Sequence, residues 1–169
     1  MNTLEAIHKR VSIRHYTEEP ISEEDQLTLM KAAMAAPSGM NVQPWEFYLV
    51  SDKATQDKIK EGHPYAKYDS PLIIVLAINK SRLGDKPGDL GLALCDMGAC
   101  AENILLAVTE LNLGAVWCAL YPSEERSEAT RLAIGAPEEI MPYCLIHVGH
   151  ISRQFTTKDK FKPERIHKI

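Results

Sequence analysis

The sequence has few cysteines, and none of them is arranged as a metal or redox site would require. Its 169 residues contain four cysteines, and no two of them form a C-x-x-C pair. All four lie in apolar segments, so buried free thiols are expected in preference to disulfides or metal ligands. The six histidines are scattered without metal-ligand spacing. The sequence therefore predicts no metal site.

Other signatures are also missing. G-x-G-x-x-G, Walker A, G-x-S-x-G and H-E-x-x-H strings do not occur, and no internal repeat is visible. The start has no charged segment followed by an apolar run, so no signal peptide is expected and a cytoplasmic location is predicted. The apolar stretch at 92–111 is interrupted by Asp96, Glu102, Asn103 and Glu110, which argues against a membrane span. A net charge of −4 gives no reason to expect nucleic acid or an anionic membrane as a partner.

What is present indicates one soluble domain covering residues 1–169. The hydrophobic content of 45% and the charged content of 25% are ordinary for a globular protein, and the length allows a sizeable core. The tail at about 151–169 is basic and has little to bury by itself. We expect it to become ordered by docking on a ligand or on a second subunit.

Capping residues and apolar periodicity predict about five helices and four core strands. Asn2, Ser22 and Ser123 are expected to precede helices. A long helix ending near residue 112 is apolar on nearly every face, so it is predicted to be central or at a subunit interface. The connection before it, 81–91, is predicted to be mobile. Strands are predicted at 45–50, 72–79, 115–121 and 143–149, with their pairing left open.

Two N-terminal helices are each expected to bury one apolar face. The first face is predicted to contain Leu4, Ile7 and Val11. The second is predicted to contain Leu27, Met30, Ala33 and Met34.

Two short segments carry most of the functional signal. Residues 10–16 read RVSIRHY and place two guanidiniums and a hydroxyl within five positions, which suits a phosphate. Residues 36–45 read APSGMNVQPW, a Pro/Gly-punctuated loop whose two side-chain amides suit a flat heterocycle offering donors and acceptors. Together they point to a phosphorylated aromatic cofactor, and FMN fits best. Each segment alone also fits a structural role, as a solvated helix end or a helix-stopping turn.

With these segments in order, the whole chain resembles the nitroreductase family of FMN-dependent oxidoreductases, in particular its compact members. The resemblance also rests on the segment running from Asp96 through ENILLA to LGAVWCALYP, and on the basic tail KDKFKPERIH. It implies an α+β sandwich with a central mixed β-sheet surrounded by helices, built as an intertwined homodimer with FMN at the interface. The implied reaction is ping-pong transfer of a hydride from NADH or NADPH through FMN to a nitroaromatic, quinone or similar acceptor.

The resemblance assigns cofactor-binding roles to four groups of residues. Arg10 and Ser12 are expected near the phosphate and ribityl chain, and Arg14 near the ring, where a cation stabilises negative charge. The second group, reaching the flavin across the dimer interface, comprises Pro37, Ser38, Gly39, Asn41 and, more weakly, Gln43. The third group comprises Cys118, Ala119 and Leu120, expected to offer backbone N–H groups to the ring, with the Cys118 thiol acting only in packing. The fourth comprises Lys158 and Lys160, expected to close the phosphate site.

Substrate contacts are expected from Tyr65 and Tyr68, in a loop that could cover the ring. No general acid or base is assigned, because the redox chemistry belongs to the cofactor. One alternative is a flavin-binding carrier or sensor that does not turn over. A hydrolase using Ser12 or Ser38 with His8, His15 or His63 is disfavoured, because the sequence offers neither an elbow motif nor an orienting acid. Because extra helical material over the flavin is missing, we expect an open pocket and a broad acceptor range.

Overall fold

The protein was analysed as a computed structural model that describes residues 1–86 and 88–169. Pro87, which belongs to the predicted 81–91 connection, lies outside the described residues. The helices are α1 (Thr3–Lys9), α2 (Glu23–Met34), α3 (Lys53–Glu61), α4 (Asp89–Glu110) and α5 (Glu124–Ala133). The strands are β1 (Trp45–Val50), β2 (Leu72–Asn79), β3 (Leu113–Ala119) and β4 (Ile140–His150). Three 3-10 turns are η1 (Gly39–Asn41), η2 (Lys80–Arg82) and η3 (Pro163–Arg165).

The predicted helix starts are confirmed by the capping contacts. The Asn2 side chain accepts a hydrogen bond from the Glu5 N–H while Glu5 reaches back to the Asn2 backbone, a full capping box. Ser22 and Ser123 cap α2 and α5 in the same way through their hydroxyls. These short polar side chains satisfy N–H groups that a helix start leaves without a partner.

The four strands form one sheet in the order β1-β2-β4-β3, and every neighbouring pair is antiparallel. The β2 strand reads LIIVLAIN and is buried along almost its whole length, as expected for a central strand covered on both faces. Among the described residues, the parallel component is one bridge between Ser12 and Ala115. The expected mixed sheet is thus an antiparallel ladder with one parallel contact at its β3 edge.

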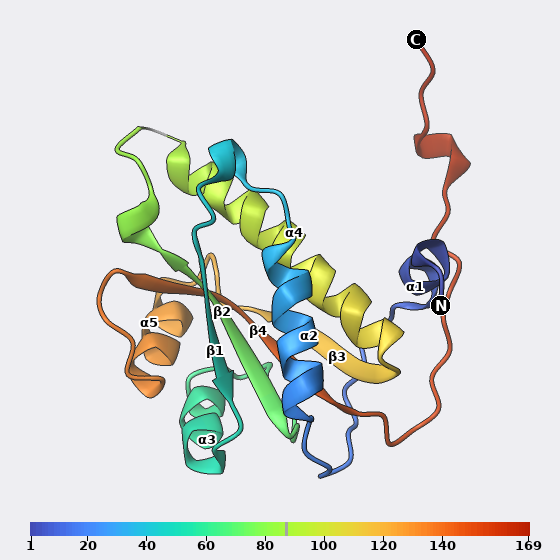
Figure 1. Ribbon diagram of the computed structural model, residues 1–169, viewed down its shortest axis with the longest axis horizontal. Coiled ribbons are helices and arrows are strands. Elements are labelled where there is room, and N and C mark those ends of the chain that lie inside the picture. The colour runs from blue at the N-terminus through green and yellow to red at the C-terminus, as the bar shows by residue number, and fades with distance from the viewer. Residues whose placement is uncertain (87) are drawn as a thin grey trace.

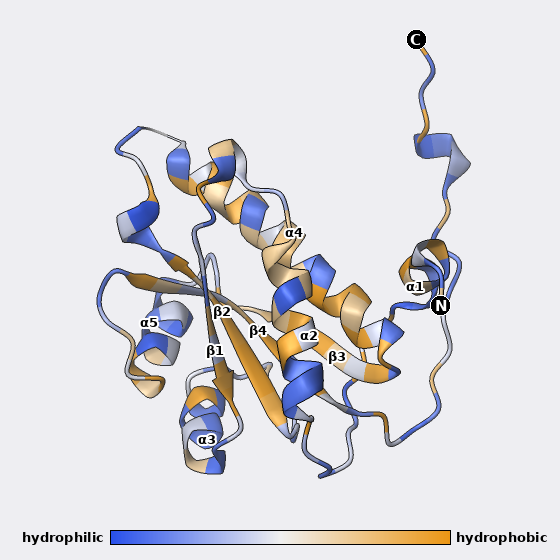
Figure 2. Cartoon of the chain, viewed as in Figure 1, coloured by the Kyte–Doolittle hydropathy of each residue, from blue (hydrophilic) through white to orange (hydrophobic). Residues whose placement is uncertain are grey.

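Helices cover both faces of the sheet, which gives an α+β architecture in three layers (Figure 1). Alternate side chains of β2 face opposite sides: Leu72, Ile74 and Leu76 pack with α2 and α4, whereas Ile73 and Val75 pack on the side of α3. Figure 2 shows the largely apolar strands between helices that mix polar and apolar residues.

By length and composition alone, α4 is apolar enough to cross a membrane. In the structure it packs on the sheet, and Met97, Cys100, Ala101 and Ile104 are fully buried in that contact. This is the arrangement of a core helix in a soluble domain.

The predicted inner faces of α1 and α2 are only partly right. Met30 and Ala33 are buried, but Leu27 and Met34 are 55% and 53% exposed. On α1, Leu4 and Ile7 are 67% and 46% exposed. Within a single chain these apolar side chains therefore have no cover, which periodicity alone does not reveal.

The segment after α1 crosses the edge of β3 at very close range. The Ile13 N–H donates to the Ala115 carbonyl at 2.8 Å. A Cβ built on Gly114 would lie 2.7 Å from Ile13 Cγ2 and 3.0 Å from Ile151 Cγ1. Only glycine fits here, and its small size lets residues 10–14 lie against the strand.

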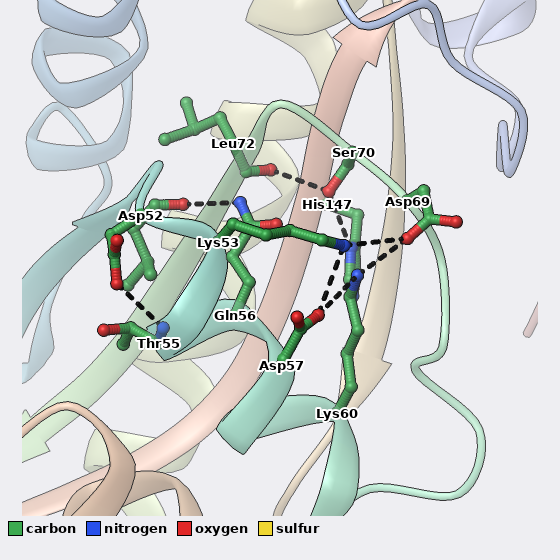
Figure 3. A network of polar contacts seen from close by, with 11 residues as sticks. Asp52, Lys53, Thr55, Gln56, Asp57, Lys60, Asp69, Ser70, Leu72 and His147 are labelled. Carbon is green, nitrogen blue, oxygen red and sulfur yellow. Dashed lines mark hydrogen bonds and ion pairs between the residues drawn. The ribbon is translucent and has the colours of Figure 1, made fainter.

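On the α3 side of the sheet, a polar network surrounds the fully buried His147 (Figure 3). The Ser70 hydroxyl donates to the Leu72 carbonyl at 3.2 Å and lies 2.9 Å from His147 Nδ1. Because a hydroxyl has one hydrogen to donate, His147 Nδ1 carries the proton in that contact, and Nε2 has no partner among the described residues. Nearby, Lys60 donates to Asp69 at 2.9 Å, and this contact is the main cause of the lowered pKa of that carboxyl.

We predict that Gly114→Ala destabilises the protein by about 1–3 kcal/mol, because the new methyl group must displace Ile13. Urea unfolding at constant FMN measures the change. Gly91→Ala is the control: this exposed residue of α4 has open space around it, so alanine should be neutral or stabilise by about 0.5–1 kcal/mol. Equal stability of wild type and Gly114→Ala would contradict the packing argument.

We also predict acid destabilisation from His147. Burial, with Lys60 and His63 nearby, lowers its pKa to about 4, with Asp69 opposing. The unfolded chain takes up this proton near pH 6.5, so stability is present above that pH and lost as the pH falls toward 4. Between about pH 7.5 and pH 5, wild type should lose about 2 kcal/mol more than His147→Gln. Urea midpoints at fixed FMN and protein concentration measure this difference, and equal losses would assign acid sensitivity to other groups.

Candidate functional site

The residues of the first predicted group line the edge of β3. Arg10 ends α1, and its Nε lies 3.4 Å from Glu102 Oε1 of α4. Ser12 bridges Ala115 and is exposed. The exposed Arg14 contacts the Ser12 carbonyl through a guanidinium nitrogen at 3.5 Å. The two guanidiniums and the hydroxyl are therefore presented along one edge of the sheet.

Beyond Ala115 no strand of the described chain pairs with this edge, and backbone alternation decides which of its N–H groups face outward. Ala115 bonds outward to Ile13, so Trp117 and Ala119 also face outward, whereas Cys118 faces β4. The Leu120 N–H is already bonded to the Tyr143 carbonyl at 3.1 Å. The prediction that Cys118, Ala119 and Leu120 all offer an N–H is therefore corrected to Ala119 alone, because the other two pair with β4.

The Cys118 side chain lies in the core on the α3 side of the sheet. Burial raises the pKa of this thiol to about 11, and the nearby Arg14 guanidinium offsets only part of that increase. The thiol is therefore protonated at neutral pH and is a poor nucleophile. This geometry supports the expected packing role.

The second predicted group forms a tightly bonded loop around η1. Pro37 is exposed, and the Ser38 hydroxyl accepts from the Gln43 N–H at 3.0 Å. The Gln43 side-chain amide donates to Asn41 Oδ1 at 2.9 Å. This leaves the Asn41 NH₂ and the Gln43 Oε1 pointing to no partner among the described residues, one donor and one acceptor side by side.

The backbone of this loop is unusual. Met40, Asn41 and Gln43 have φ values of 50°, 57° and 51° without being glycine. Such residues cost energy and are concentrated at functional loops. Gly39 itself is held by its N–H, which donates to Asp96 Oδ1 of α4 at 3.0 Å.

One chain does not bring the two predicted groups together. Arg10 contacts α4 at Glu102, whereas Gly39 contacts it at Asp96. Six residues separate these contacts, which is about 9 Å along the helix and about 120° around it. Figure 1 shows η1 near the start of α4 and α1 beside its far end.

The two predicted substrate tyrosines lie in different environments. Tyr65 is 70% exposed. Tyr68 is half-buried, and its ring packs edge-on against His147 with the centroids 5.4 Å apart. Of the two, Tyr65 is the more exposed.

Lys158 and Lys160 lie on the tail, which runs away from the body of the chain (Figure 1). Both are exposed, as are Phe155, Phe161 and Ile166 around them. Thr157 lies against α1, but no hydrogen bond or ion pair joins either lysine to Arg10 within the described residues.

Sequence reasoning considered His63 only as a histidine of the disfavoured hydrolase, whereas the structure places it at the same edge. It is buried, and its Nε2 lies 3.0 Å from the Ala119 carbonyl. One histidine in a loop gives no local signal for such a contact, because β3 is more than fifty residues away in sequence. Asp96 and Glu102, two of the carboxylates that interrupt the apolar helix α4, contact Gly39 and Arg10.

These donors fit a cofactor that has a phosphate and a hydrogen-bonding ring. The two guanidiniums and Ser12 suit the phosphate, and the outward Ala119 N–H suits a ring acceptor. Proteins normally cover or block the free edge of a β-sheet. An edge that has no pairing strand and lies beside two arginines is therefore more consistent with a ligand-binding site than with a surface exposed only to solvent.

Comparison with known proteins agrees with this architecture. A sequence model described as the nitroreductase family matches residues 7–63 and 60–150. A Methanothermobacter thermautotrophicus protein provisionally named NADH dehydrogenase/NAD(P)H nitroreductase is 38% identical over 169 residues, covering 99% of this chain and 86% of the relative.

Two solved structures share the fold. A Parabacteroides distasonis protein with the same provisional name has a TM-score of 0.90 and 35% identity, covering 99% of this chain and 98% of that one. A provisionally named nitroreductase from Desulfovibrio desulfuricans, solved in complex with FMN, has a TM-score of 0.85 and 25% identity, covering 100% of this chain and 97% of that one. The matches extend over nearly the whole length, so the expected resemblance is confirmed: this chain belongs to the nitroreductase family.

Proposed function

We propose that this protein is an FMN-dependent oxidoreductase that passes electrons from NADH or NADPH to small acceptors such as nitroaromatics and quinones. The observation that carries the proposal is the open half of the β3 edge, where the Ala119 N–H faces outward. The relatives named as NAD(P)H nitroreductases and the FMN-bound neighbour support the same cofactor and donors.

Each residue has a defined task in this proposal. FMN, when bound, supplies the two-electron chemistry. Arg10 and Ser12 hold the phosphate by charge and hydrogen bonding, and the Ala119 N–H orients the ring. Arg14 places a positive charge where negative charge develops, which lowers the cost of reduction. Cys118 stays protonated and only packs.

We place donor and acceptor in turn at the same open site, which gives ping-pong kinetics. The donor leaves after reducing the cofactor, and the acceptor then takes its place. The acceptor's proton comes from solvent, so no side chain is assigned as acid or base.

The working form in this proposal is a homodimer. Three observations support it: α1 and α2 expose Leu4, Ile7, Leu27 and Met34, the tail extends away from its own body, and the η1 loop is separated from Arg10 around α4. A second copy covers the apolar side chains and brings its own η1 loop to the first copy's β3 edge. In the same arrangement, Lys158 and Lys160 add positive charge at a phosphate.

The visible spectrum of the purified protein tests the proposal. The protein should be yellow, lose its flavin absorbance with NADH or NADPH under anaerobic conditions, and recover it when a nitroaromatic or quinone is added. Omitting the nicotinamide is the control. Yellow protein that neither donor bleaches would favour a flavin carrier or sensor, and protein that binds no FMN would contradict the site itself.

A further inference from the structure

An exposed tyrosine is held rigidly beside the open edge of β3. The Tyr65 N–H donates to His63 Nδ1 at 3.2 Å. Because Nδ1 accepts, His63 carries its proton on Nε2, which donates to the Ala119 carbonyl at 3.0 Å. The buried His63 thus connects the Tyr65 loop to the same residue whose N–H faces the edge, while Tyr65 itself is 70% exposed.

The same loop is packed against α5. A Cβ built on Gly62 would lie only 2.8 Å from Ala129 Cβ, so the backbone touches the helix directly at that point. Arg126 lies three residues before Ala129 and hence on the same face of α5. Its guanidinium carbon is 5.5 Å from the centre of the Tyr65 ring. The loop and the helix together form one aromatic–cationic surface.

Arg126 forms no ion pair with a carboxylate of the described chain. Glu128 pairs instead with Arg131 at 2.6 Å, and no ion pair joins Arg126 to any described residue. Glu124 and Glu128 line a groove with Lys80 and Arg131 on another face of α5. A guanidinium at this distance from a ring keeps its N–H groups available for an external acceptor, and a planar anion matches their fork geometry.

We propose that Tyr65 and Arg126 form a recognition site for planar substrates that carry an anionic group. Tyr65 provides a face for the substrate ring, and Arg126 binds its carboxylate, sulfonate or phosphate. The site lies beside Ala119, so it selects among molecules that reach the cofactor. The inference rests on the proposed function and names the substrate chemistry that this function favours.

The anionic group could belong to either of two molecules: the electron acceptor or the nicotinamide donor, which carries phosphates.

Binding of benzoate and benzamide to FMN-loaded protein, monitored by the flavin absorption spectrum, tests recognition of the anion without turnover. Wild type should bind benzoate more tightly than benzamide. Arg126→Gln should weaken benzoate roughly tenfold, as expected for loss of one charge-assisted contact, and leave benzamide almost unchanged.

Kinetic arms distinguish the two sources. If the acceptor is recognised, Arg126→Gln lowers kcat/KM for para-nitrobenzoate roughly tenfold but not for para-nitrobenzamide. If the donor is recognised, Arg126→Gln slows anaerobic reduction by NADH or NADPH instead, and the two acceptors react alike.

Tyr65→Ser should weaken the binding of both benzoate and benzamide, whereas Tyr65→Phe should retain it. Lys58→Gln at an exposed position of α3, which has no ion pair among the described residues, removes the same charge and should change nothing.

The proposal is overturned if Arg126→Gln changes neither benzoate binding nor either half of the reaction, whether or not it lowers thermal stability. That result would make the Tyr65–Arg126 contact a stabilising surface pair only. Failure of the proposed function looks different: no donor would reduce the wild-type protein, while the binding comparison between benzoate and benzamide would still report on this site.

Discussion

The close approach of residues 10–14 to the first half of β3 is the constraint on which the site depends. Gly114 leaves room for Ile13, and the Ile13 N–H then bonds to the Ala115 carbonyl. This contact covers the edge as far as Ala115 and stops there. It fixes Arg10, Ser12 and Arg14 at one end of an open strand edge and leaves the outward N–H of Ala119 at the other. Without it, the three polar residues would be an ordinary solvated helix end.

The two faces of the sheet support this edge differently. On one face, α4 and α2 bury an apolar core that fixes β3 and β4. On the other, α3 and the loop after it carry polar groups, with His63 bonded to Ala119 and His147 fully buried beneath. The edge is therefore positioned by rigid packing from one side and by directed hydrogen bonds from the other. Residues on such a support can hold a ring in one orientation more precisely than residues on a free loop.

Local signals in the sequence predicted much of this fold. The helix caps at Asn2 and Ser22 follow from side-chain chemistry within four residues, and the strands at 45–50 and 72–79 follow from their apolar runs. The segment expected to bind a phosphate could also be predicted, because Arg10, Ser12 and Arg14 lie within five positions of one another in the sequence. What was missed depends on distant contacts. Choosing Ala119 over Cys118 and Leu120 as the outward N–H donor requires knowing that β3 pairs with β4. Predicting that Leu27 and Met34 are exposed requires knowing which parts of the same chain pack against α2.

Hydrogen exchange at single amides tests the central claim most directly. The claim is that the cofactor lies along the open half of the β3 edge and bonds to the Ala119 N–H. Exchange of assigned amides is compared between FMN-loaded and FMN-free protein. The Ala119 amide should exchange at least about tenfold more slowly when FMN is bound, as expected for roughly 1.4 kcal/mol of protection, while the Leu120 amide, already bonded to Tyr143, should change little. An unchanged Ala119 amide in fully loaded protein would contradict this account.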